Sequence, residues 1–268
     1  MTTGSIFASD SINHTGDITA SQSYVGSLVG NATNSDVSSP KTAFTGTLSG
    51  VDYVGGMAGN ITGNLSLGTS TIDVTVNGKG NYVGGIAGKY VRSIDTPSVF
   101  SGIPYKAIVT GVDYVGSMFG YLGNTTTGAI QIDNTILNGS TSGDDHVGGI
   151  AGYVGNTSSG SVNFDKVTIN SPITSTGSYL GGITGEINNS STGSITVTND
   201  NISTGNLSTT KDYVGGIAGY VGFTGAGTIN INNTPINLNV TGANYVGGLI
   251  GYNYDTLGNK EDINNIYV

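Results

Sequence analysis

The sequence has no cysteine, no tryptophan, 5 prolines and few charged residues, which make up 9% of its 268 positions. Without cysteine there is no disulfide framework to hold a small core together. The 8 lysines and arginines stand against 17 aspartates and glutamates, and they form no cluster that would bind the phosphates of a nucleic acid. No apolar run is long enough for a membrane-spanning helix. We therefore expect neither a nucleic-acid partner nor a transmembrane helix.

Glycine, tyrosine and β-branched residues are abundant instead, with 46 glycines and 15 tyrosines. Valine, isoleucine, threonine and tyrosine favour a pleated, half-buried surface, whereas disordered chains are poor in them. No segment carries a sustained apolar period of 3.6 residues, so helices should be scarce. The composition indicates a folded and nearly all-β chain.

One seven-residue phrase recurs eight times: an aromatic residue, Val or Leu, Gly, Gly or Ser, a large aliphatic residue, a variable residue, and Gly. Its copies begin at Tyr24, Tyr53, Tyr82, Tyr114, His146, Tyr179, Tyr213 and Tyr245. The intervals between them are 29, 29, 32, 32, 33, 34 and 32 residues. A fixed period of this length indicates stacked supersecondary units, and we interpret residues 1–268 as a single repeat domain.

Each period also contains short segments with apolar residues at alternate positions. Examples are Gly160-Ser-Val-Asn-Phe-Asp, Gly227-Thr-Ile-Asn-Ile-Asn and Ile236-Asn-Leu-Asn-Val-Thr. Alternation with period two is typical of a strand with one buried face. A unit of three such strands cannot bury its apolar face alone, but stacked units can. The sequence predicts an all-β parallel β-solenoid, or β-helix, of about eight coils of 29–34 residues with three short strands per coil, roughly 40 Å long.

The repeated phrase is apolar or small on both faces if it forms one strand. We therefore expect a strand buried on both sides, with stacked tyrosine rings and with glycine where another backbone comes close. The alternative is an exposed aromatic strip that binds a sugar or a protein. Representative positions with a packing role are Tyr53, Gly55, Gly59, Tyr82, Gly84, Gly88, Tyr213, Gly215 and Gly219.

The phrases Tyr82-Val-Gly-Gly-Ile-Ala-Gly and Tyr245-Val-Gly-Gly-Leu-Ile-Gly, together with Val29-Gly30, resemble the GLUG repeat, a short glycine-rich motif of bacterial surface proteins. That family includes large adhesins and the stalk regions of immunoglobulin-A-cleaving metalloproteases. The resemblance covers most of the chain through the eight phrases, although Ile or Met mostly replaces the usual Leu. It implies a secreted, surface-attached, repetitive adhesin segment and carries no catalytic residues with it.

Catalytic groups are sparse. The two histidines are His14, in a turn phrase, and His146, which takes an aromatic position of the repeat, and no zinc-binding spacing occurs. The aspartates that precede the aromatic are interchangeable with Asn and Ser, which indicates turn formation and not acid–base catalysis. They are Asp52, Asp113, Asp145 and Asp212. We expect no catalytic residue and no cofactor; calcium on oxygen-rich turns is the alternative, although the repeat of calcium-binding β-rolls is absent.

The least regular stretch runs from Lys89 to Lys106 and contains Arg92, the one arginine of the chain. We interpret it as a loop excursion from one coil. If a ligand site lies outside the strands, the cations Lys89, Arg92 and Lys106 mark the place where we expect it.

These observations predict a non-catalytic structural or adhesive segment of a secreted or surface-exposed protein. We expect an extracellular or bacterial cell-surface location and a glycan or protein partner on a host or neighbouring cell. Because no signal peptide is visible at the start, we expect a segment of a longer exported protein. The alternatives are a self-assembling subunit of an extracellular filament and, below it, a polysaccharide-degrading enzyme or a glycan binder similar to phage tailspikes.

Overall fold

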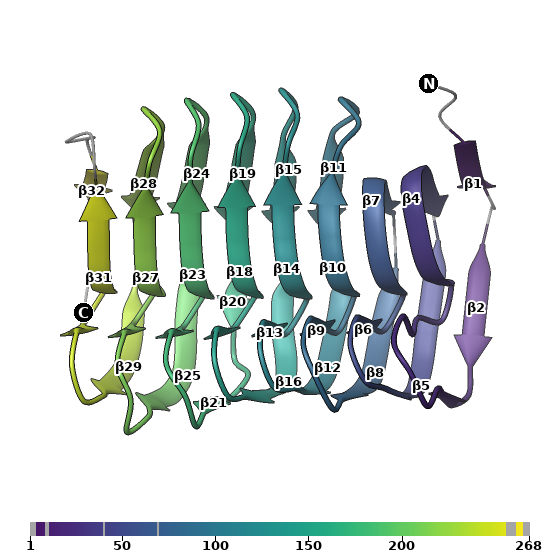
Figure 1. The fold of residues 1–268 in the computed structure, drawn as a ribbon, viewed down its shortest axis with the longest axis horizontal. Helices are drawn as coiled ribbons and strands as arrows, with labels where there is room; N and C mark the ends of the chain where they lie inside the picture. The colour runs from purple at the N-terminus through teal and green to yellow at the C-terminus, as the bar shows by residue number, and fades with distance from the viewer. Residues whose placement is uncertain (1–3, 9–10, 40, 69, 256–260, 265–268) are drawn as a thin grey trace.

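The computed structural model describes residues 4–8, 11–39, 41–68, 70–255 and 261–264 as a β-solenoid of about eight turns. All regular structure in these residues is β-strand, and they include no helix of the length and apolarity needed to cross a membrane. Strands of successive coils lie side by side in rows along the long axis, and the two ends of the chain lie near opposite ends of the rod (Figure 1). The predicted fold class is confirmed.

Three parallel sheets, named A, B and C here, run along the rod. Sheet A contains β1 (Gly4–Ala8), β4 (Val29–Ser39), β7 (Ala58–Leu67), β10 (Ala87–Arg92), β11 (Ser98–Ser101), β14 (Phe119–Asn124), β15 (Ile130–Asp133), β18 (Ala151–Asn156), β19 (Ser161–Asp165), β23 (Thr184–Asn189), β24 (Ser194–Thr198), β27 (Ala218–Phe223), β28 (Thr228–Asn232), β31 (Ile250–Asp255) and β32 (Glu261–Asn264). Sheet B contains β2 (Ile12–Thr15), β3 (Ile18–Thr19), β5 (Thr42–Gly50), β8 (Thr71–Gly78), β12 (Pro104–Thr110), β16 (Ile136–Gly143), β20 (Thr168–Ile169), β21 (Ile173–Ser175), β25 (Asn201–Ser208) and β29 (Ile236–Thr241). Sheet C contains β6 (Val54–Gly55), β9 (Val83–Gly84), β13 (Val115–Gly116), β17 (Val147–Gly148), β22 (Leu180–Gly181), β26 (Val214–Gly215) and β30 (Val246–Gly247).

Each strand pairs with its equivalent one coil along, so that like residues stack on like residues. In sheet A, β14 pairs with β18 and places Leu122 opposite Val154. The same apolar row continues through Ile187 to Val221. All of these side chains are buried, and each buried aliphatic side chain contributes about 1.5–3 kcal/mol relative to an exposed one. The apolar alternation in the sequence therefore becomes a continuous core along the rod axis.

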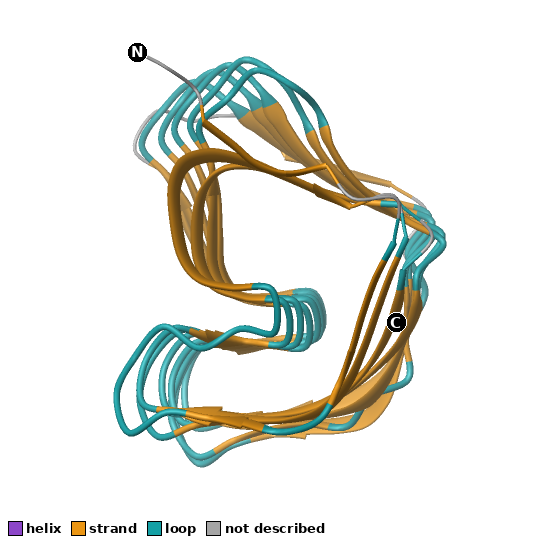
Figure 2. Cartoon of the chain, turned by 90° about the vertical axis from the view of Figure 1, so that its right-hand side faces the viewer, coloured by secondary structure: helices purple, strands orange, loops and turns teal. Residues whose placement is uncertain are grey.

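The repeated phrase is a corner, and the expectation that it forms one continuous strand is wrong. In the third copy, β9 covers only Val83–Gly84, a bend follows, and β10 begins at Ala87. Ile86 at the bend is fully buried, as Val83 is, so the corner itself is part of the core. Viewed along the axis, the outline of the coils is indented on one side, where the chain folds back toward the interior (Figure 2). Sheet A also contributes two strand segments to most coils, so three sheets carry four segments.

Close backbone contact explains the glycines that flank the corner. A Cβ atom added at Gly84 would lie 2.3 Å from the carbonyl oxygen of Ala87 and 2.7 Å from the backbone nitrogen of Gly120 in the next coil. At Gly88 it would lie 2.4 Å from the carbonyl oxygen of Tyr82. No side chain fits at such distances, so the two glycine positions of the phrase are steric requirements of stacking corner on corner.

Candidate functional site

The aromatic residues of the eight phrases form one continuous stack along the rod. Neighbouring ring centroids are 4.4 to 4.9 Å apart and the rings are tilted by 4 to 15° from parallel. This geometry confirms the predicted stacking of the rings. The members of this row, named the first ring row here, are Tyr24, Tyr53, Tyr82, Tyr114, His146, Tyr179, Tyr213 and Tyr245.

Every member of the first ring row has a left-handed backbone, with φ between 52 and 67°. This conformation is unfavourable for a residue with a Cβ atom. Two kinds of contact offset the cost. Stacked aromatic pairs contribute about 0.5–1.5 kcal/mol each beyond their buried area. Carboxylates of the preceding position also hold the turns of successive coils together: Asp52 accepts a hydrogen bond from the backbone N–H of Asn81 at 2.7 Å, and Asp212 accepts one from Asn244 at 3.0 Å.

These aspartates belong to the stacking of the turns. The Asp145 carboxylate accepts the backbone N–H of Ser178, and Asp113 accepts the backbone N–H of Asp145. Burial, and after it the charge of Asp145, raises the pKa of the Asp113 carboxyl above its ordinary value. In the recurring contact, a carboxylate of one coil accepts a hydrogen bond from a backbone N–H of the next coil. This contact holds the turns together and is the role that the turn prediction gave these residues.

A second row, which the sequence reasoning missed, faces the first. It comes from the third residue of the long sheet A strands, directly after the last glycine of each phrase, and is named the second row here. Its members are Asn31, Asn60, Lys89, Tyr121, Tyr153, Glu186, Tyr220 and Tyr252. A signal was present, because Gly-Tyr-Leu-Gly or Gly-Tyr-Val-Gly occurs three times, at 120–123, 152–155 and 219–222.

The glycine two residues after each of these tyrosines makes room for its ring. A Cβ atom at Gly155 would lie 2.9 Å from the Tyr153 ring, and one at Gly123 would lie 3.0 Å from the Tyr121 ring. In the coils whose second-row residue is Asn, Lys or Glu, the corresponding position is Thr, Val or Asn. Ring and glycine therefore occur together in three coils, whereas Tyr252 is followed at this position by Tyr254.

The two rows meet edge to face. Tyr121 packs against Tyr82 with centroids 6.2 Å apart and planes at 69°, and Tyr153 packs against Tyr114 at 6.1 Å and 76°. Burial raises the pKa of the Tyr121 and Tyr153 hydroxyls above the ordinary value. The next cause of the raised pKa is a neighbouring hydroxyl, that of Tyr82 for Tyr121 and that of Tyr121 for Tyr153. Both faces of an interior ring in the first ring row are covered by its neighbours, so that a ligand could meet only ring edges and hydroxyls. This arrangement favours the packing interpretation over the exposed strip.

His146 interrupts the first ring row without breaking the stack. Its ring lies 4.5 Å from that of Tyr114 and 4.4 Å from that of Tyr179. Its Nε2 lies 3.1 Å from a carboxylate oxygen of Glu186 in the second row, and both side chains are largely buried. The Nδ1 atom is buried without a hydrogen-bond partner among the described residues. His14, in contrast, lies on β2 opposite Phe44 at one end of the rod.

The three cations of the irregular stretch do not share a surface. Lys89 belongs to the second row, with Nζ 5.6 and 5.0 Å from the ring centroids of Tyr82 and Tyr121, and is a cation–π donor there. Lys106 is exposed on sheet B and lies 3.3 Å from Asp73. Arg92 is fully buried. The expected ligand site built from these cations therefore has no counterpart in their arrangement.

Arg92 closes the loop after β10 by hydrogen bonds, as an asparagine closes the equivalent loop in later coils. It lies in register with Asn124, and Asn156 and Asn189 follow in the same row. Those asparagines close the loop between the two sheet A strands of a coil; Asn156, for example, donates to the carbonyl of Gly160 at 2.9 Å. Arg92 donates to the Thr96 carbonyl through Nε at 2.9 Å and Nη2 at 2.7 Å. Burial lowers the pKa of this guanidinium, and backbone and side-chain oxygens replace its water shell.

The irregular stretch does border a surface hollow of about 360 Å³ at the corner between sheets A and B. Two neighbouring coils line it, and its walls carry no charged side chain. Its principal lining residues are Gly102, Pro104, Tyr105, Asn134, Ile136 and Asn138. Pro104 lies opposite Ile136 in the sheet B register, and Ile136 is 53% exposed.

No candidate metal cluster emerges from the part of the chain that the structure describes, where no three His, Cys, Asp or Glu side chains gather. Calcium on the Asp and Asn turns stays a prediction. No protein-family model, curated protein or solved structure matches this chain.

Proposed function

We propose that this chain is a non-catalytic structural and adhesive segment of a secreted, surface-exposed protein. The observation that supports this most strongly is the use of the recurring residues. The first ring row, the corner glycines and the carboxylates before the rings all make contacts from coil to coil. Contacts of this kind give a stiff rod whose outer faces are free to vary, as in other solenoids that present extended binding surfaces.

The resemblance to the GLUG repeat of bacterial surface proteins supports the same proposal and adds a bacterial cell surface as the location. The partner would then be a glycan or a protein on a host or neighbouring cell. The exposed faces of sheet B are rich in Ser, Thr and Asn, with positions such as Thr71, Asn201 and Ser203 outward. Neutral hydrogen-bonding surfaces of this composition suit uncharged glycans better than charged polymers.

Attachment of protein-coated beads to cells and to immobilised glycans tests the adhesive part. Beads that carry the folded chain should attach, and beads that carry a variant with Gly116→Ala and Gly148→Ala, which disrupts the corners, should not. Equal attachment of the two would show nonspecific adsorption and contradict the proposal. Absence of attachment to any cell or glycan leaves a spacer role, for which small-angle scattering should give a stiff rod.

A second candidate is end-to-end association into a filament. Val246, Tyr245 and Tyr254 are 43%, 49% and 45% exposed and gather on the coil of β30 and β31, which end the strand order of sheets C and A. Among the described strands, β30 pairs with β26 and β31 with β27, and strand edges are templates for further pairing. If association uses this edge, Val246→Lys should lower the apparent mass in concentration-dependent light scattering. Val112→Lys, at a 39% exposed position away from the edge, is the matched control.

The enzyme alternative remains a prediction of lower rank. A polysaccharide-degrading activity would release reducing ends from a glycan that the chain binds. Release of reducing ends that persists when the chain is purified further, and that is lost in Glu186→Gln or Asp113→Asn, would contradict the non-catalytic proposal.

A further inference from the structure

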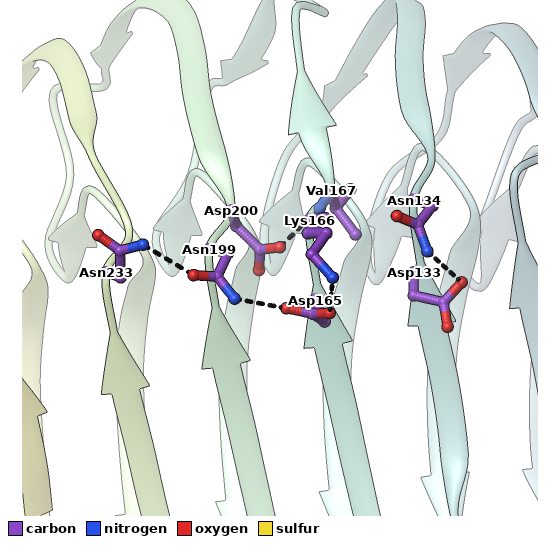
Figure 3. A network of polar contacts seen from close by, with 8 residues as sticks. All are labelled: Asp133, Asn134, Asp165, Lys166, Val167, Asn199, Asp200 and Asn233. Carbon is purple, nitrogen blue, oxygen red and sulfur yellow. Dashed lines mark hydrogen bonds and ion pairs between the residues drawn. The ribbon is translucent and has the colours of Figure 1, made fainter.

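The hollow at the corner between sheets A and B exists because one coil departs from the repeat. Four successive coils place a residue with left-handed backbone at this corner: Asn134, Lys166, Asn199 and Asn233, with φ from 48 to 56°. Asn233 donates to Asn199 at 2.7 Å and Asn199 donates to Asp165 at 2.8 Å, so that a polar ladder joins three of these coils, whereas Asn134 donates to Asp133 of its own coil (Figure 3). The equivalent residue one coil before Asn134 is Gly102, with φ of 60°.

Gly102 leaves the row of corner side chains one member short. A Cβ atom added at Gly102 would have no heavy atom within 4 Å, so that space beside Asn134 is open. The floor beside it departs from the repeat as well. Ile136 and Pro104 are exposed where the next coils carry Thr168 and Asn201. Proline recurs at this register position in Pro235, so the combination of Gly102 with the adjacent Pro104 and Ile136 is what gives this corner an aliphatic hollow edged by amides.

The remaining lining supplies polar groups of one kind. Asn134 donates through Nδ2 to Asp133 at 3.3 Å, and Asn138 donates through Nδ2 to the Tyr105 carbonyl at 3.4 Å. Within the described residues no partner is recorded for the side-chain oxygen of either amide, and each amide retains a second N–H. Both side chains are exposed at the rim. The hollow therefore offers hydrogen-bond donors and acceptors above an apolar floor, without a charge.

We infer that this hollow binds one ring of a neutral saccharide. A pyranose has one face of C–H groups, which suits Pro104 and Ile136, and hydroxyls around its edge, which suit the amides of Asn134 and Asn138. The volume of about 360 Å³ is near the lower end of small-molecule sites, about 300–1,000 Å³, and fits a single ring. An anionic or cationic ligand would find no counter-charge in the lining. This inference rests on the adhesive function proposed above and names its ligand class.

Titration of the isotope-labelled chain with methyl glucoside, methyl galactoside and N-acetylglucosamine, followed by amide NMR, tests the site. At least one of them should shift the signals of Gly102 and of the Asn134 and Asn138 side chains. The dissociation constant should be about 1–10 mM, the range for a single ring at ordinary ligand efficiency. Sodium glucuronate should bind more weakly than the neutral sugars.

Two variants locate the site without disturbing the fold. Gly102→Asn adds the missing corner side chain, because asparagine tolerates a left-handed backbone, and should weaken binding at least tenfold by filling the hollow. Ile136→Thr installs the residue type of the next coil and should weaken binding by removing the floor. Asn201→Ala, exposed two coils along in the same register, is the matched control and should leave binding unchanged.

Absence of shifts at these residues with all three sugars, or unchanged binding by Gly102→Asn, would overturn the inference. Stronger binding of glucuronate would also overturn it, because it would show recognition of charge. The bead assay separates the two proposals. If the beads attach but the sugars cause no NMR shifts, only saccharide binding in the hollow is contradicted. If the sugars cause NMR shifts but the beads do not attach, only the adhesive function is contradicted.

Discussion

His146 and Glu186 meet at 3.1 Å through Nε2 and a carboxylate oxygen, and each stands where neighbouring coils carry a tyrosine. His146 replaces a member of the first ring row, and Glu186 replaces a member of the second. Where the second row has tyrosine, as at Tyr153, it packs edge-on against the ring of the coil before it. The polar pair thus keeps the contact between rows while changing its chemistry from aromatic packing to a polar contact between a ring nitrogen and a carboxylate.

The contribution of the His146–Glu186 contact to the free energy of unfolding can be measured in a double-mutant cycle. We expect Glu186→Gln to lower the free energy of unfolding by about 0.5–1 kcal/mol, because it removes the charge of a largely buried acceptor. In a His146→Phe background, which keeps a stacked ring, the same substitution should change stability much less. Chemical denaturation at pH 7 measures both effects. An equal loss in the two backgrounds would show that the contact contributes nothing specific.

The close contacts of the corner make a second prediction. Gly116→Ala would place a Cβ atom 2.1 Å from the Phe119 carbonyl oxygen and 2.6 Å from the Ala151 Cα, both of them backbone. We expect a loss of about 3 kcal/mol or more, since neither coil can move without displacing its neighbours. Gly123→Ala in the same coil meets side chains only, the Tyr121 ring at 3.0 Å and Val91 at 3.4 Å, and should be much milder. Thermal unfolding of the two variants gives the comparison, and similar melting temperatures would contradict it.

Asp200 makes stability depend on pH. The side chain is fully buried where other coils have Thr135, Val167 or Thr234, and one oxygen accepts the backbone N–H of Val167 at 2.7 Å (Figure 3). Its other oxygen is buried without a partner among the described residues. Burial raises the pKa of this carboxyl well above its usual range, and the nearby Asp165 raises it further, while the hydrogen bond from Val167 lowers it.

Because the folded state holds this proton more tightly than the unfolded state, stability should fall as pH rises above the unfolded pKa of about 3.9. Asp200→Asn keeps the acceptor for Val167 and removes the titration. We expect the variant to be more stable than the parent at pH 7, by about 1–3 kcal/mol, with a smaller difference at pH 4. Urea unfolding at both values measures this. Asp73→Asn, at an exposed site, is the control, and a pH-independent difference for Asp200→Asn would contradict the argument.

Arg92 and Lys106 separate a structural cation from a surface one. Arg92→Ala empties the space of a fully buried side chain and leaves the Thr96 carbonyl without its two donors, and we expect a loss of about 2–5 kcal/mol. Lys106→Ala removes an exposed ion pair with Asp73 and should change stability by less than about 0.5 kcal/mol. Denaturant midpoints of both variants measure the contrast. A mild effect of Arg92→Ala would contradict the structural role of Arg92 and favour the ligand-site role that the sequence predicts.

Much of the fold was open to prediction from the sequence because stacking forces the same residue type to recur at the same place. The positions of Tyr82, Gly84 and Gly88 recur in all eight phrases, and the structure uses each in contact with its own equivalent. The strands followed from period-two alternation for the same reason. The corner did not, because a phrase with small residues on both sides looks like a doubly buried strand until its neighbours are placed.

The sequence by itself determined the coil count, the parallel stacking of equivalent strands and the row of stacked rings, since each is written as a periodic pattern. The tertiary structure alone decided what the non-periodic residues do. It buried Arg92 within the fold, placed Lys89 over tyrosine rings, paired His146 with Glu186 and opened a hollow beside Gly102. Those outcomes depend on which side chains of adjacent coils come together, and contacts between residues some thirty positions apart leave no local pattern when they occur only once.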